Sequence, residues 1–165
     1  MKIVPKENSA EVRRAFIQRF TMTWAEFQKR NQEWIESVAK QNYIVRYEKL
    51  YLWELMDYPR ISFHQALELL RSMECDVLMM SENESKPHCQ GIIIDGRKRK
   101  GAVATANAAE LADLIESEWN EIGRRCVLPQ DLYVFDESLE RLLVFTHEYD
   151  SKGRRYCKMV GFMCT

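Results

Sequence analysis

The chain has 165 residues, 46% of them apolar and 30% charged, which is the composition of an ordinary globular domain. Its 24 basic and 25 acidic side chains nearly cancel. This balance argues against a protein that wraps DNA or binds polyphosphate, which would carry a strong basic excess. A chain of this length can bury about 70% of its unfolded surface, so we expect one domain, residues 1–165, that needs no metal or disulfide to hold its core.

The cysteines and the lengths of the apolar runs indicate a cytoplasmic protein. The chain has five cysteines and no CxxC pair, so neither a disulfide framework nor a structural zinc site is expected. Free thiols in this number suit a reducing compartment. The N-terminus lacks the apolar stretch of a signal peptide, and no run approaches the roughly 18 apolar residues of a membrane span. We therefore expect no membrane partner.

Residues 1–74 have the patterns of helices. Asn8, Thr23 and Ser62 are each followed three residues later by Glu or Gln, which is the capping-box pattern of a helix start. A further helix is expected over residues 43–56, where large apolar side chains occupy most of the circumference, and Pro59 follows it. These helices form the first of two parts of the domain.

From residue 75 onward the sequence reads as strands with one inserted helix. Asp95 and Gly96 predict a two-residue hairpin turn, and Asn107 predicts the cap of a helix over 108–122 that ends at Gly123. Strands are expected over 76–80, 91–94, 97–104, 131–135, 142–148 and 156–162. The fold class is therefore α+β. The N-terminal helices should pack on one face of a mostly antiparallel sheet of about five or six strands, which ends in a C-terminal β-meander.

The clearest enzymatic hypothesis pairs Cys157 with His147, which lie on adjacent predicted strands. A thiol next to a base can become a nucleophilic thiolate. However, a cysteine in an ordinary strand pattern is more typical of an inert core position. The histidines have no metal-ligand spacing, and neither a glycine-rich phosphate loop nor a G-x-S-x-G turn occurs. We expect no catalytic residue, metal or cofactor, with a small hydrolase or transferase using Cys157 and His147 as the alternative.

The basic run Arg97–Lys100 has two interpretations. It could contact a phosphate backbone, which would make the chain a nucleic-acid-binding module. The other interpretation is an edge strand, because a strand with charge on both faces cannot be central and charged edges prevent sheets from aggregating. The second interpretation is favoured, since four charges alone bind nucleic acid weakly at physiological salt.

Acidic side chains are the stronger candidates for recognition. They gather on the solvent side of the predicted 108–122 helix and at the turns of the meander. Such a surface would speed association with a basic partner. The residues proposed to bind a partner are Glu110, Asp113, Glu116, Asp136, Glu137, Glu148 and Asp150. The four tryptophans, Trp24, Trp34, Trp53 and Trp119, fall on apolar stripes and are expected in the core. An exposed one would instead be an interface anchor.

The size, the free cysteines, the lack of catalytic motifs and a layout ending in DLYVFDESLERLLVFTHEY give the chain a family resemblance. It resembles the small bacterial α+β immunity proteins of contact-dependent and polymorphic toxin systems. The resemblance covers no defined motif and assigns no residue. It implies a non-enzymatic inhibitor that binds a cognate protein toxin domain, often a nuclease, whose basic cleft the acidic helix and turns would cover.

Overall fold

The computed structural model describes residues 1–40, 52–81, 92–94, 97–99, 101–119, 128–129 and 131–162. Its helices are α1 (Lys6–Phe20), α2 (Trp24–Lys40), α3 (Phe63–Arg71), α4 (Ala108–Trp119) and the short 3-10 helix η2 (Leu52–Leu55). Its strands are β1 (Lys2–Ile3), β2 (Arg60–Ser62), β3 (Asp76–Ser81), β4 (Ile92–Ile94), β5 (Arg97–Arg99), β6 (Val103–Asn107), β7 (Leu132–Phe135), β8 (Leu142–Tyr149) and β9 (Arg155–Val160).

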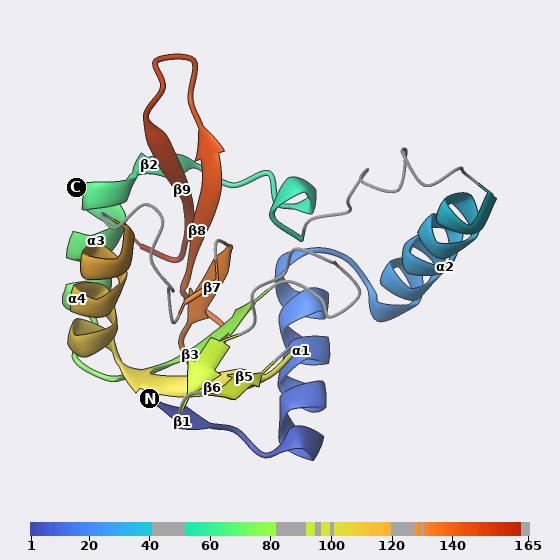
Figure 1. Ribbon diagram of the computed structural model, residues 1–165, viewed down its shortest axis with the longest axis horizontal. Coiled ribbons are helices and arrows are strands. Elements are labelled where there is room, and N and C mark those ends of the chain that lie inside the picture. Colours follow the sequence, from blue (N-terminus) through green and yellow to red (C-terminus); the bar gives the residue numbers. More distant parts are fainter. Residues whose placement is uncertain are drawn as a thin grey trace.

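Seven of the strands form one sheet in the order β1-β6-β3-β7-β8-β9-β2, and β4 and β5 form a separate two-stranded ribbon (Figure 1). Every strand pair is antiparallel, and α4 is inserted between β6 and β7. The predicted α+β class is therefore confirmed. The sheet gains β1 and β2 as edge strands, which are too short to show a period of two in the sequence.

Helices cover both faces of this sheet, which corrects the expectation that they pack on one face (Figure 1). α3 and α4 lie on one face, where Leu67, Leu70 and Leu111 pack with Phe145 and Cys157. α1 and η2 lie on the other face, where Phe16 and Phe20 belong to a second cluster of buried side chains. The alternation of side chains along each strand supplies both clusters, so the sheet is apolar on both sides.

Three of the four predicted helix caps are formed. Thr23 and Glu26 bond reciprocally, with Thr23 N–H to Oε2 at 3.0 Å and Glu26 N–H to Oγ1 at 3.3 Å. Ser62 forms the same box with Gln65, and Asn107 Oδ1 accepts from the backbone N–H groups of the first turn of α4. These caps satisfy N–H groups that a helix start leaves unbonded. Since the capping side chain and the N–H group are only a few residues apart, such caps can be predicted from the local sequence.

Two predicted boundaries are wrong. α1 begins at Lys6 rather than near Asn8, with Pro5 as its N-cap, because the Pro5 carbonyl accepts from the backbone N–H of Ser9 at 2.8 Å and so starts the helical hydrogen bonding. The strand expected over 97–104 is split into β5 and β6, with Gly101 between them at a φ of +64°. That left-handed backbone favours glycine and turns the chain from the ribbon into the main sheet. The 43–56 helix lies mostly outside the described residues, and its last part is η2.

Candidate functional site

The seven acidic residues proposed from sequence lie in three places. Asp136 and Glu137 are in the turn before β8, whereas Glu148 and Asp150 are at its far end. Eight residues of extended chain separate these ends, about 26 Å at the usual rise per residue. The remaining three, Glu110, Asp113 and Glu116, are on α4. The structure therefore does not bring them into one continuous surface.

Asp136 and Asp150 hold turns. Asp136 is 6% exposed, and its carboxylate accepts from the backbone N–H groups of Glu140 and Arg141 at 2.9 and 3.0 Å. These hydrogen bonds and those from Ser138 and the Arg141 side chain lower the pKa of Asp136, against desolvation, which is the largest single influence and raises it. Asp150 similarly accepts from the backbone of Arg154 at 2.8 Å. Both carboxylates act within the fold.

Asp113 and Glu116 form a cross-helix ion pair with Arg71 of α3. The guanidinium lies 2.9 Å from Asp113 Oδ1 and also bonds Glu116 Oε2. The hydrogen bond to Asp113, followed by that to Glu116, raises the pKa of Arg71. Asp113 is nevertheless 73% exposed. The pairing offsets one of the two negative charges on this part of α4 and ties α4 to α3.

Exposed carboxylates do gather at one end of the sheet, where β3 and β8 begin and β6 and β7 end. The registers Asp76↔Asn107 and Leu78↔Phe135 place these strand ends side by side. Three strand spacings, about 14 Å, cover the distance from the end of β6 to the start of β8. The five exposed acidic residues at this end, which we call the acidic end, are Glu74, Asp76, Glu110, Glu137 and Glu140.

Among the described residues, few basic groups neighbour the acidic end. Arg141 is 38% exposed and paired with Asp136 at 3.0 Å. Lys2 lies at the edge of the sheet, where it pairs with Thr105. Glu74 and Asp76 were not proposed from the sequence, because only the strand register shows that residues about 60 positions apart share this end.

Cys157 and His147 are on adjacent strands, but they are directed into different surroundings. Cys157 is 1% exposed in the cluster beneath α3, where burial raises the pKa of its thiol to about 12. His147 lies edge-on to Trp53, which belongs to the cluster on the other face. The structure does not bring the thiol and the imidazole together as a nucleophile and its base.

His147 instead pairs with Asp131, a residue that the sequence reading did not select. Nδ1 of His147 lies 2.8 Å from Asp131 Oδ1, and the backbone N–H of His147 donates to the same oxygen at 3.1 Å. Nε2 lies 3.3 Å from Glu148. The hydrogen bond to Asp131 is the main reason that the pKa of His147 is raised, and desolvation opposes it. The pair resembles the base and orienting group of many active sites, although such pairs also occur as structural ion pairs.

The basic run Arg97–Lys100 is described at residues 97–99, which form β5. Arg97 and Arg99 are exposed, and in the described part of the chain β5 pairs with β4 alone. Ile92 of β4 is fully buried against the α3–α4 face. The arrangement is that of a charged edge strand beside a covered apolar strand.

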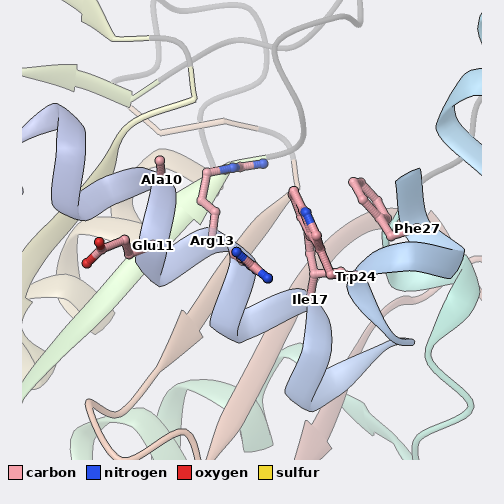
Figure 2. A pocket seen from close by; sticks show the side chains of 7 residues that line it. Ala10, Glu11, Arg13, Ile17, Trp24 and Phe27 are labelled. Atoms are coloured by element: carbon pink, nitrogen blue, oxygen red, sulfur yellow. The ribbon is translucent and has the colours of Figure 1, made fainter. Parts of the chain in front are cut away.

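A cleft of about 400 Å³ lies between α1 and the start of α2. Figure 2 shows the rings of Trp24 and Phe27 beside each other, next to the Arg13 side chain. The two rings are stacked, with centroids 5.4 Å apart, and the Arg14 guanidinium lies 5.8 Å from the Trp24 centroid. Arg13 donates to the Ser81 carbonyl at 2.9 Å. Trp53 is in the core as expected, but Trp24 is only partly buried, at the side of this cleft.

Among the described residues, no group of three or more His, Cys, Asp or Glu side chains is placed to hold a metal ion. In the same part of the chain, no helix has the length and apolar content needed to cross a membrane. Comparison with known proteins found no family model, no curated protein and no solved structure that matches this chain.

Proposed function

We propose that this chain is a non-enzymatic inhibitor that binds another protein, as an immunity protein binds its cognate toxin. The observation that supports it is the acidic end, where five exposed carboxylates come from the α3–β3 loop, β3, α4 and the β7–β8 turn. A concentration of one sign of charge attracts a partner of the opposite sign and raises the association rate. The partner surface is therefore basic, as in the cleft of a nuclease domain.

Hydrogen bonds fix the backbone segments that carry the residues of the acidic end. Asp136 fixes the turn that carries Glu137 and Glu140, and Asn107 caps the helix that carries Glu110. The contact of Arg141 with Cys75, at 4.0 Å, brings that turn beside the α3–β3 loop. Rigid placement of the charges reduces the conformational entropy lost on binding. This end therefore supplies a preorganised surface, whereas isolated exposed charges would not.

The test compares two double charge reversals with the same change in net charge. Glu110→Lys with Glu137→Lys alters the acidic end, and Glu33→Lys with Glu36→Lys alters α2. A protein that co-purifies with the tagged chain in its native cells is first identified and produced on its own. Binding kinetics between the two purified proteins are then measured at several salt concentrations.

The acidic-end variant should associate about tenfold or more slowly at low salt, and its rate should depend less on salt. The α2 variant should stay within about twofold of the unaltered chain. Equal association rates for the two variants would contradict the proposal, as would a partner whose contact surface is not basic. Inhibition is read separately, as the loss of the partner's toxicity or nuclease activity in the presence of the chain.

A further inference from the structure

The cleft between α1 and α2 is a second surface with features of a binding site. Its lining residues are Ala10, Glu11, Arg13, Arg14, Ile17, Trp24 and Phe27. The lining combines tryptophan and arginine, the residue types that dominate binding energy at protein interfaces. Its residue Arg13 bonds Ser81, the last residue of β3, whereas the acidic end lies where β3 begins, so the proposed contact with a basic partner leaves the cleft unexplained.

The charge of this region is positive. Residues 1–40, which hold both helices, carry eight basic and five acidic side chains, a net charge of +3. The cleft itself has two arginines against one glutamate. Arg14 is exposed, and no carboxylate of the described residues lies within ion-pairing distance of it. A carboxylate on a ligand would complement this charge and could bond the guanidinium in two places.

The aromatic rings favour a protein segment over a nucleic acid. A nucleobase stacks on a bare ring face. Here one face of the Trp24 ring is stacked on Phe27 at an interplanar angle of 23°, and Arg14 lies near the ring at 5.8 Å. Together with Ile17, these rings form the apolar side of the cleft, and the partly buried Trp24 ring supplies most of its exposed apolar surface, because Ile17 is 3% and Phe27 is 8% exposed. An apolar side chain of a ligand would complement this surface.

We propose that this cleft binds a segment of a partner protein in which an apolar side chain lies next to a carboxylate. The apolar group packs mainly against the Trp24 ring, which lies beside Phe27, and the carboxylate pairs with Arg14. Arg13 adds positive charge beside it, held in position by its hydrogen bond to Ser81. The inference rests on the proposed function in that both take a protein as partner. The cleft, however, would bind an acidic segment, whereas the acidic end would bind a basic surface.

The test uses three fluorescein-labelled probes and fluorescence anisotropy on the full chain. One is a short peptide of alternating Glu and Leu with a central Phe, the second has Lys in place of Glu, and the third is a single-stranded DNA of matching charge. The cleft variant is Arg14→Glu. Its matched control is Lys29→Glu, an equal charge change on α2 at a side chain that is 78% exposed. Circular dichroism checks that both variants fold.

The acidic peptide should bind, and Arg14→Glu should weaken it about tenfold or more. Lys29→Glu should change the affinity less than about twofold. Absence of binding, equal binding of the basic peptide, or equal losses in both variants would overturn the inference. Tighter binding of the DNA would assign the cleft to nucleic acid instead. The variant with Glu110→Lys and Glu137→Lys should keep its peptide affinity, so failure at the acidic end and failure at the cleft are distinguishable.

Discussion

The pair formed by Asp131 and His147 makes the stability of the fold depend on pH. Asp131 is 8% exposed, His147 is 30% exposed, and the carboxylate lies 2.8 Å from Nδ1. The folded-state pKa of His147 is raised above its ordinary value of 6.5, mainly by this hydrogen bond. Its contribution to the free energy of unfolding is therefore fully present below the unfolded pKa and is lost as the pH rises through the folded pKa.

The size of the effect follows from the two states of the imidazole. A hydrogen bond to a charged group such as the Asp131 carboxylate contributes about 1.5–3 kcal/mol, and protonation of the imidazole adds the attraction between opposite charges. Because the imidazole is partly exposed, water screens this added attraction to about 0.5 kcal/mol. We expect a coupling energy of about 2 kcal/mol at about pH 5.5 and about 1.5 kcal/mol at about pH 9.

A double-mutant cycle measures this coupling directly. Asp131→Asn keeps an oxygen that can accept from the backbone of His147 but removes the charge, and His147→Gln removes the titrating ring. Urea unfolding of the unaltered chain, both single variants and the double variant is followed at each pH. A coupling energy that is the same at both pH values, or larger at the higher one, would refute the reasoning.

Two further predictions concern the core and a turn. The Cys157 thiol should resist a neutral thiol reagent in the folded protein and react on unfolding in urea, because it is 1% exposed and its pKa is about 12; rapid labelling of Cys157 under native conditions would instead favour a reactive cysteine. Gly161→Ala should lower the free energy of unfolding by at least about 1 kcal/mol more than Gly153→Ala, as measured by urea titration. Both glycines have a positive φ, but a Cβ at Gly161 would lie 2.1 Å from the Glu140 carbonyl oxygen, whereas nothing lies within 4 Å at Gly153. Equal losses in the two variants would show that backbone strain alone accounts for both.

The local elements could largely be predicted because their causes are local. The caps at Thr23, Ser62 and Asn107 use side chains within three residues of the N–H groups that they bind. The apolar strands β3, β7 and β8 appear in the sequence for the same reason, since each is a short run buried on both faces. The strands that were missed, β1 and β2, are two and three residues long, and they depend on their partners β6 and β9.

The candidate sites could be predicted only in part. The acidic character of α4 was readable, because Glu110, Asp113 and Glu116 lie on one helix. Arg71, which pairs with Asp113 and Glu116, is 42 residues from Asp113 along the chain, and no local pattern predicts this pairing. The cleft was missed because Arg14 and Trp24 belong to different helices, and each fits an ordinary helical pattern. The sequence shows the pair Arg13 and Arg14, followed by Trp24 and Phe27. This spacing does not predict that the four side chains line one cleft.

The near-neutral charge of the chain conceals an asymmetry that the sequence alone reveals. Residues 1–60 carry a net charge of +3, and residues 61–165 carry −4. Composition and periodicity by themselves also determined the α+β class, the helix caps and the apolar strands, because these depend on neighbours a few residues apart. Only the tertiary structure decided where the charges act. Strand register places Asp76 and Glu137 at one end of the sheet, and Asp136, next to Glu137, is buried and holds the turn. The tertiary structure also leaves Trp24 at a basic cleft and buries Trp53. Contacts between distant segments decide which of two chemically identical side chains remains available to a partner.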